Sequence, residues 1–398
     1  IMLCHEVLGK FNYYKKKENE ALTNKILKDL DVAYIDPKAL VSTLSIANQQ
    51  MVEIAKAISI KAKILIMDEP TSSLTEKEES ILFDLIRRLK AQGLSIVYIS
   101  HKLDEIFKVC DEVTILRDGQ WIDTFPIEEA TRERIIEKMV GRSLDTVFPQ
   151  QIEKVRPNVR LEVKDLTHYG LISDINFTIN EGEIFGVSGL VGAGRSEMAN
   201  TIFGMLEKDK GSIYIDGVET IINSPRDAIA AGIAFVTEDR KKEGLFLDLS
   251  VLDNILSSNL SEVEQKLKVV NRKKEIDIAK GGIEKLDIKT PSLYTFVKSL
   301  SGGNQQKLII ARWLTKNVKI LILDEPTRGI DVGAKQAIYK IMRELTARGL
   351  SILMISSELP EILGMSDRIA VMKNGKILRI LAKQEASQQK IMSIITEE

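Results

Sequence analysis

The sequence predicts an α/β protein in which helices cover mostly parallel sheets and one such unit occurs twice. Short apolar segments alternate with segments of helical periodicity, a pattern typical of a parallel sheet clothed by helices. In addition, a Leu-Ser-x-x-Asn-Gln-Gln segment precedes an apolar segment ending in Asp-Glu-Pro-Thr, at residues 44–71 and again at 300–327. The two serines, Ser45 and Ser301, lie 256 residues apart (301 − 45). We interpret this repeat as a tandem duplication.

In the first copy, the apolar periodicity predicts seven elements in chain order. Helices are expected at 18–33, 45–59, 77–92 and 104–109, and strands at 63–67, 95–100 and 112–116. The uninterrupted apolar character of the strand at 63–67 predicts that it is buried. The Asp-Gly pair at 118–119 predicts a hairpin turn, and Asn-Gly at 374–375 repeats it at the same offset of 256 residues (375 − 119).

The chain is expected to hold two domains joined by a short linker. Residues 1–140 form the first domain, residues 141–160 form a polar linker containing Pro149 and Pro157, and residues 161–398 form a complete second domain. The second domain opens with strands predicted at 161–163, 175–179 and 184–187. The chain begins with Ile1, and the first-copy counterpart of Gly189 would fall at position −67 (189 − 256), before the first residue. We therefore expect the first domain to be truncated at its N-terminal side.

Composition limits the class of protein. The chain has 398 residues with 56 Lys+Arg against 57 Asp+Glu, so its net charge of −1 creates no global field for nucleic acid or anionic lipid. Its two cysteines, Cys4 and Cys110, make neither a disulfide framework nor a metal cluster, which favours a reducing cytoplasm. No apolar run approaches the roughly 20 residues of a membrane-spanning helix.

A glycine-rich segment after the strand at 184–187 has the spacing of a phosphate-binding loop. Backbone N–H groups of such a loop and of the following helix N-terminus bind phosphate oxygens. Arginine stands where lysine is usual, and its planar fork is expected to allow binding while impairing transition-state positioning. A purely structural glycine turn is the alternative. The candidate residues are Gly189, Gly192, Ala193, Gly194, Arg195 and Ser196.

Acidic pairs end one apolar strand in each copy. Asp324 and Glu325 end the strand at 320–323, and Asp68 and Glu69 end its counterpart. An aspartate at this position can hold Mg²⁺ together with Ser196, and the adjacent glutamate can polarise an attacking water. Solvated loop residues are the alternative for either pair alone, but the repeat in register argues against it.

A serine cap followed by two glycines begins a helix in the second copy. Such a helix N-terminus exposes N–H donors and can close over a nucleotide held by another domain. The signature residues of the second copy are Ser301, Gly302, Gly303, Asn304 and Gln305. The first copy keeps Ser45 but has Ile46 and Ala47 in place of the glycines, which are expected to obstruct close approach.

A histidine follows the strand at 95–100. His101 could hydrogen-bond a γ-phosphate, and its place after the acidic pair favours this role over a packing role. In the second copy, Glu358 is expected at the corresponding place, where its charge would repel phosphate.

Together these motifs resemble the ATP-binding cassette (ABC) family. The tandem layout, the phosphate loop ending in Arg195 and the Thr237–Arg240 segment are most similar to the double-cassette ATPases of bacterial monosaccharide importers. The galactose/methyl-galactoside type is the nearest match and the ribose type the next. The resemblance implies two ABC nucleotide-binding domains, each with a mostly parallel sheet, a helical subdomain and an antiparallel β lobe, the first being incomplete.

The resemblance also implies head-to-tail pairing of the cassettes around two unequal ATP and Mg²⁺ sites. One site would combine Asp68, Glu69 and His101 with the signature residues Ser301 to Gln305. The other would combine the phosphate loop with Asp324 and Glu325, and it is expected to hydrolyse ATP poorly. Its departures from the family pattern are Arg195, Glu238 in the place of a glutamine, Glu358, and Ile46-Ala47 in the facing signature.

The implied partners are integral-membrane permease subunits and, through them, a periplasmic or extracellular sugar-binding protein, without nucleic acid. The implied location is peripheral, on the cytoplasmic face of a bacterial membrane. A soluble tandem ATPase acting on ribosomes or DNA is the alternative, although residues 141–160 are shorter and more broken by prolines than the linkers of such proteins. We also expect the 398-residue chain alone to hydrolyse ATP poorly.

Overall fold

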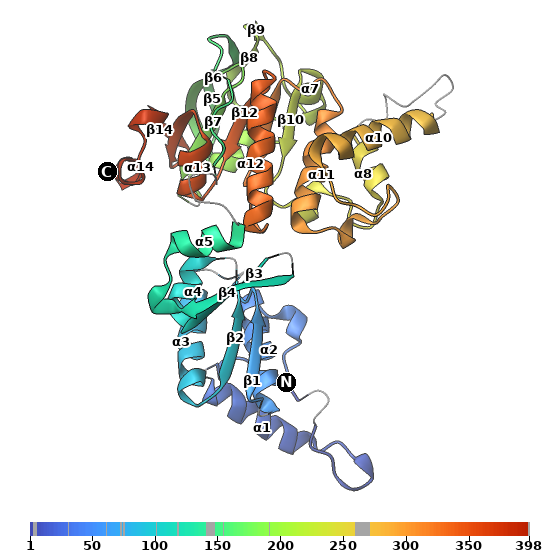
Figure 1. Ribbon diagram of the computed structural model, residues 1–398, viewed down its shortest axis with the longest axis vertical. Coiled ribbons are helices and arrows are strands. Elements are labelled where there is room, and N and C mark those ends of the chain that lie inside the picture. The colour runs from blue at the N-terminus through green and yellow to red at the C-terminus, as the bar shows by residue number, and fades with distance from the viewer. Residues whose placement is uncertain are drawn as a thin grey trace. The chain divides into compact units, whose positions relative to one another are not determined.

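The computed structural model divides the chain into two compact units, Ile1–Arg142 and Ser143–Glu398 (Figure 1). The described residues are 1–2, 6–30, 32–60, 62–71, 74, 76–100, 102–117, 119–140, 148–153, 155–190, 192–258 and 271–396.

The first unit combines a small parallel sheet with an antiparallel hairpin. β1 (Ile64–Asp68) pairs in parallel with β2 (Ser95–Ile99), and β3 (Glu112–Arg117) pairs in antiparallel fashion with β4 (Gln120–Pro126). The helices are α1 (Lys16–Asp29), α2 (Ile46–Ser59), α3 (Glu76–Ala91), α4 (Leu103–Val109) and α5 (Arg132–Val140), with 3-10 turns at Lys10–Asn12, Val41–Thr43 and Ile127–Glu129. Each of the seven elements predicted for this copy is present, with ends shifted by at most four residues.

The prediction that the first of these strands is buried was wrong. Leu65 and Met67 of β1 are buried against the helices, whereas Ile64 and Ile66 on the other face are 62% and 66% exposed. Among the described residues of this unit, the helical core covers only one face of the sheet. The equivalent strand of the second unit is buried along its whole length because both of its faces are covered.

The second unit is built on a six-stranded sheet with the order β10-β11-β12-β7-β13-β14, which is parallel except for the edge strand β14. Its strands are β7 (Ile184–Gly189), β10 (Ile233–Val236), β11 (Ile320–Asp324), β12 (Ser351–Ile355), β13 (Arg368–Lys373) and β14 (Lys376–Ala382). β13 and β14 form the hairpin predicted at Asn374 and Gly375. The equivalent turn between β3 and β4 includes Asp118, which lies outside the described residues.

An antiparallel lobe and a group of helices complete the second unit (Figure 1). The lobe has the order β6-β5-β8-β9, formed by β5 (Val159–His168), β6 (Ile172–Asn180), β8 (Lys210–Ile215) and β9 (Val218–Glu219). The helices are α6 (Arg195–Ile202), α7 (Pro225–Ala230), α8 (Val251–Leu256), α10 (Arg272–Leu286), α11 (Gly302–Leu314), α12 (Val332–Ala347), α13 (Leu359–Met365) and α14 (Gln388–Thr396). Shorter turns lie at Arg240–Gly244, Val297–Ser299 and Lys383–Glu385. The predicted α/β architecture with an antiparallel lobe and a helical subdomain is confirmed.

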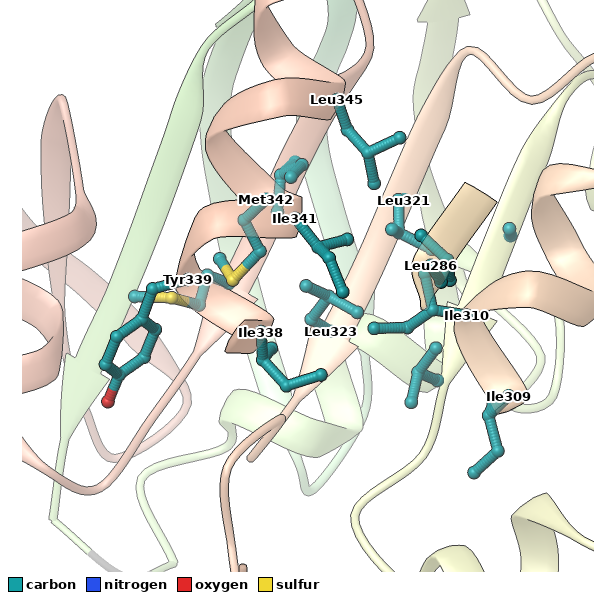
Figure 2. Packing of buried hydrophobic residues seen from close by; sticks show 14 of the residues in the cluster. Leu286, Ile309, Ile310, Leu321, Leu323, Ile338, Tyr339, Ile341, Met342 and Leu345 are labelled. Carbon is teal, nitrogen blue, oxygen red and sulfur yellow. The ribbon is translucent and has the colours of Figure 1, made fainter. Parts of the chain in front are cut away.

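The central sheet separates two hydrophobic clusters. Alternate residues of β11 enter opposite clusters, with Leu321 and Leu323 facing the helical side and Ile320 and Ile322 facing the antiparallel lobe. Figure 2 shows the helical side, where side chains of α12 lie beside Leu323. Each fully buried aliphatic side chain stabilises the fold by about 1.5–3 kcal/mol. The sheet is therefore a firm base for the loops that follow its strands.

The parallel register brings three strand ends to one edge of the sheet. β12 lies between β11 and β7, and it pairs Ile355 with Asp324 on one side and with Val187 on the other. The loops after β7, β11 and β12 therefore start close together, which is where ligands bind in open α/β sheets. Among the described residues, no helix combines the length and apolar character needed to cross a membrane.

Candidate functional site

The phosphate loop joins β7 to α6 through backbone conformations that only glycine adopts readily. Gly192 and Gly194 have φ values of 80° and 94°. A Cβ on Gly194 would lie 3.0 Å from the Cα of Gly375, and the Gly375 amide donates to the carbonyl of Ala193 at 2.9 Å. The β13–β14 hairpin therefore holds the loop closed at the N-terminus of α6. Val191 lies outside the described residues.

A cavity of about 440 Å³ opens over this loop. It is lined by residues 192–197 together with Glu238, Glu325, Arg328 and Ser357. The structure thus brings the predicted phosphate loop, one glutamate of the acidic pair and Glu238 into one site. None of the described residues that line it belongs to the signature segment on α11.

Asp324 ends β11 as a buried carboxylate directed at the start of α6. Burial raises its pKa to about 6, although the Ser196 hydroxyl within hydrogen-bonding reach and the Arg195 guanidinium oppose this shift. Its Oδ1 atom is buried without a hydrogen-bond partner among the described residues. A hydroxyl beside an unsatisfied carboxylate oxygen is a donor set that suits Mg²⁺. The pair Ser196 and Asp324 therefore fits the predicted metal role.

Both predicted water-activating glutamates have the same strained backbone. Glu69 and Glu325 have φ values of 47° and 49°. Their amides donate at 2.9 Å to the carbonyls of Ile99 and Ile355, the last residues of the neighbouring strands. Non-glycine residues in this region cost energy, and such residues concentrate at functional sites. The duplicated motif therefore carries a duplicated geometry.

In the second unit, Arg195 turns toward Glu325. Its Nη1 donates to the carbonyl of Ser356 at 2.9 Å, and its Nη2 lies 3.7 Å from Glu325 Oε1. The Ser357 hydroxyl donates to Glu325 Oε2 at 3.0 Å. Burial raises the pKa of the Glu325 carboxyl, and the neighbouring arginine and serine oppose that shift. The arginine thus engages the glutamate that would otherwise activate water.

Glu238 lies at the rim of the cavity and forms an ion pair with Arg328. Arg328 follows the Asp-Glu-Pro-Thr motif and was not among the predicted site residues. A comparison of the two copies position by position could have found it, because the first copy has Ser72 at this place.

Arg240 is a second residue to which the sequence analysis assigned no role. Its Nη1 and Nη2 donate to the carbonyls of Arg328 and Gly329 at 2.6 and 2.9 Å. It thereby ties the segment after β10 to the loop after β11. No simple sequence signal marks this contact, because it joins residues 88 positions apart.

The signature segment caps α11 as predicted, and its polar side chains stabilise the turn. Ser301 is the N-cap, and its Oγ accepts from the Asn304 side chain at 3.0 Å. Gln305 is buried and donates to the carbonyl of Val297 at 3.1 Å. A Cβ on Gly303 would lie 2.5 Å from the Cβ of Ala334, so this glycine also permits close packing of α11 on α12.

In the first unit, the described candidate residues lie where the duplication predicts. Asp68 ends β1 and Glu69 follows it. Ser45 caps α2, and its hydroxyl accepts a hydrogen bond from the Asn48 amide at 3.3 Å. His101 lies outside the described residues, as do the side chains of Ile46 and Ala47.

The expected equivalence of His101 and Glu358 was wrong. β2 ends at Ile99 and α4 begins at Leu103, while β12 ends at Ile355 and α13 begins at Leu359. The same offset of 256 residues (355 − 99) therefore places Ser357 opposite His101. The prediction aligned Ser100 with Ser357. The second copy has two serines in succession, Ser356 and Ser357, and it is Ser356 that corresponds to Ser100. The second site thus has a hydroxyl group where a repelling carboxylate was expected.

These elements define a class of protein. A parallel sheet with a glycine-rich phosphate loop, an aspartate and a glutamate after a neighbouring strand, and a helix capped by Ser-Gly-Gly are the parts of a nucleotide-binding cassette. The family model described as ABC transporter matches residues 4–72 and 172–328, which together exceed half of the chain. The chain therefore belongs to the ABC transporter family.

Similar proteins and structures agree with this assignment. The chain is 49% identical, over 94% of its own length and 75% of the relative's, to the galactose/methyl galactoside import ATP-binding protein MglA 1 of Photobacterium profundum. It is 46% identical to the ribose import ATP-binding protein RbsA of Bacillus subtilis, over 100% of this chain and 80% of the relative. A crystal structure of a nucleotide-free ATP-binding cassette from an ABC transporter matches with a TM-score of 0.52 and 25% identity, covering 60% of this chain and 100% of that one.

Proposed function

We propose that this chain is the ATP-binding and ATP-hydrolysing subunit of a bacterial importer for a monosaccharide, galactose/methyl galactoside or ribose. The observation that carries the proposal is the cavity over the phosphate loop, which is lined by Ser196 and Glu325 of a nucleotide-binding cassette. The strained backbone of Glu325 recurs at Glu69 in the first unit, and Arg195 engages Glu325 in the second. The names of the relatives support the import function.

At the second site, the phosphate loop would bind the phosphates of ATP through the amides at the N-terminus of α6. Ser196 and Asp324 would hold Mg²⁺, which when bound would neutralise charge on the phosphate oxygens. Arg195 pairs with Glu325, and Arg328 pairs with Glu238. These arginines thereby engage the two carboxylates that would orient water. We expect this site to retain nucleotide and to hydrolyse it slowly.

At the first site, Asp68 would take the metal-binding role and Glu69 would accept a proton from the attacking water. The imidazole N–H of His101 would donate a hydrogen bond to the γ-phosphate and so stabilise the negative charge of its oxygens. Ser301, Gly302 and Gly303 would complete the site by presenting the N-terminus of α11 to the same phosphate. This composite arrangement follows the head-to-tail pairing implied by the family.

The partner would be a separate permease in the membrane, with the ATPase on its cytoplasmic side. An exposed apolar surface suits such a partner. Phe246 and Leu249 lie beside Tyr294 and Phe296 through backbone pairing of the two segments, and these four side chains are 46–66% exposed. Exposed apolar clusters of this kind mark interaction sites. A sugar-binding protein would act through the permease and make no direct contact with this chain.

Two matched variants test the assignment of roles. In the full-length protein reconstituted with its permease and sugar-binding protein, Glu69→Gln should lower sugar-stimulated ATP hydrolysis at least about a hundredfold, because the general base is lost. Binding of radiolabelled ATP should persist. Glu325→Gln should change the rate less than about threefold, since Arg195 already engages that glutamate. Equal losses in the two variants would contradict the asymmetry, and full activity of the Glu69 variant would remove its catalytic role.

A further inference from the structure

Lys102 lies at the centre of a polar cluster beside the acidic pair of the first unit. Its Nζ atom is 2.8 Å from Glu79 Oε1 on α3 and 3.2 Å from Glu105 Oε1 on α4. It also approaches the hydroxyl of Thr71 at 3.4 Å. One ammonium group therefore joins two helices to the segment that carries Asp68 and Glu69.

Glu105 is the buried acceptor of this cluster. It receives hydrogen bonds from the hydroxyls of Thr71, Tyr98 and Ser100, the last two at 2.7 and 3.0 Å. The Lys102 amide in turn donates to Ser100 Oγ at 3.0 Å. Both chain neighbours of His101 are thus tied to the carboxylate of Glu105. The same carboxylate is tied to Thr71, two residues after Glu69.

The second unit contains the same scaffold with the charges exchanged. Lys335 stands 256 residues after Glu79 and Glu358 stands 256 residues after Lys102 (335 − 79 and 358 − 102), and these two side chains pair with each other. Glu361 takes the place of Glu105 and accepts from the Thr327 hydroxyl at 2.9 Å. The Glu358 amide donates to Ser356 Oγ at 3.0 Å, as the Lys102 amide does to Ser100.

The exchange changes the environment of the buried carboxylate. In the first unit, burial disfavours ionisation of Glu105, but the hydrogen bonds from Thr71, Tyr98, Ser100 and Lys102 outweigh it and lower its pKa. In the second unit, burial raises the pKa of Glu361 to about 7. Hydrogen bonds from Ser356 and Thr327 and the charge of Lys335 oppose this shift, while the charge of Glu358 adds to it. The first unit thus has an ionised, cation-paired anchor where the second has a carboxyl that is partly protonated near neutral pH.

We infer that Lys102 is a positioning residue for ATP hydrolysis at the first site. By bridging Glu79 and Glu105 it holds the start of α4 against the segment that carries Glu69. The charge exchange in the second unit removes this anchor from the second site. The inference rests on the proposed function, because it takes Glu69 and His101 as the groups that act on ATP. Misplacement of reacting groups by about 1 Å can cost a hundredfold in rate.

The test compares steady-state kinetics of variants in the full-length protein reconstituted with its permease and sugar-binding protein. Lys102→Met should lower kcat about tenfold with the KM for ATP within about twofold, because positioning acts on the transition state. Lys102→Arg should recover most of the rate, since a guanidinium can bridge both carboxylates. Lys90→Met is the matched control, because it removes an exposed lysine of the same unit that pairs with Asp111 at the surface.

The charge-exchanged double variant Glu79→Lys/Lys102→Glu reproduces the pair of the second unit in the first. This variant should hydrolyse ATP slowly. Its rate of hydrolysis should rise between about pH 6 and 8, because Glu105 then ionises without a paired cation. Among the described residues, Tyr98 and Lys102 are the titratable groups that face Glu105, and Glu79 faces Lys102. Of these three, only residues 79 and 102 change in the variant. Wild-type enzyme should lack this additional dependence.

Either of two results would overturn the inference. The first is a kcat for Lys102→Met within twofold of that of the Lys90→Met control. The second is a wild-type rate of ATP hydrolysis in the charge-exchanged variant, without new pH dependence. A wild-type protein without sugar-stimulated hydrolysis would instead contradict the proposed function. If Lys102→Met folds poorly, the charge-exchanged variant carries the test by itself, because it keeps one cation and one carboxylate at these two positions.

Discussion

Charged side chains distinguish the two copies at the residue scale. Arg195 fills the lysine position of the phosphate loop and engages Glu325, while Arg328 engages Glu238. Each pair neutralises a carboxylate that would otherwise face phosphate. Coulomb repulsion between a carboxylate and phosphate is strong in a partly buried site, so these pairs permit nucleotide binding.

Glu361 provides a test at this scale. Its folded pKa of about 7 lies above the ordinary value of 4.5, so its protonated form is favoured by folding. The stability it contributes is fully present below about pH 4.5 and is lost as pH rises through about 7. Between pH 5 and 8 this loss is of the order of 3 kcal/mol. Glu361→Gln should remove that part of the pH dependence. Urea unfolding followed by Trp313 fluorescence in a Trp121→Phe background measures it.

The difference between wild type and Glu361→Gln isolates this group from Asp324, whose pKa of about 6 gives a dependence of the same sign. The variant should therefore gain stability relative to wild type as pH rises. A difference that stays constant from pH 5 to 8 would show that Glu361 is ionised throughout.

At the scale of elements, glycines decide how closely the signature helix packs. A Cβ on Gly303 would lie 2.5 Å from the Cβ of Ala334, which is too close for any real contact, so α11 and α12 would have to move apart. A Cβ on Gly281 in α10 would meet nothing within 4 Å. The same residue type is therefore essential to packing at one position and replaceable at another.

This contrast predicts opposite effects of two alanine substitutions. Gly303→Ala should lower the free energy of unfolding of the second unit by about 1–3 kcal/mol, because overpacking outweighs the better helix propensity of alanine. Gly281→Ala in α10, where a Cβ meets nothing within 4 Å, should raise it by up to about 1 kcal/mol. Urea unfolding curves of both variants give the two values, and a stabilising effect of Gly303→Ala would refute the packing argument.

At the scale of the whole molecule, the two copies differ in how completely their sheets are covered. Within the described part of the first unit, Ile64, Ile66, Val97 and Ile99 form an apolar sheet face whose residues are 46–66% exposed. In the second unit, the corresponding face packs on the antiparallel lobe and α6. The first unit therefore gains less stabilisation from burial in the 398-residue chain.

Unfolding of the chain should follow from this difference. Each unit holds one of the two tryptophans, Trp121 in the first and Trp313 in the second. In single-tryptophan variants made by Trp→Phe substitution, the fluorescence of Trp121 should change at a lower urea concentration than that of Trp313. Coincident transitions would instead mean that the two units unfold as one cooperative body.

Short contiguous patterns were enough to predict much of this protein. The phosphate loop, the strand-end acidic pairs, the capped signature helix and both hairpins depend on residues close together in the chain, and backbone chemistry at those residues determines the local structure. The repeat supplied the long-range information that a single copy lacks. Because the copies share one offset, each element found in one predicted its counterpart in the other.

Tertiary structure alone decided which charges meet. The contacts of Arg195 with Ser356, of Arg240 with Arg328 and of Lys102 with Glu79 join segments 161, 88 and 23 residues apart. No local periodicity encodes such distances. The exposure of one face of β1 likewise follows from what packs beside the strand. The equivalence of Ser357 with His101, by contrast, was already contained in the shared offset of the two copies. The sequence by itself determined the duplicated cassette and its motifs, and the packed structure decided how its charges are paired, because pairing depends on three-dimensional proximity.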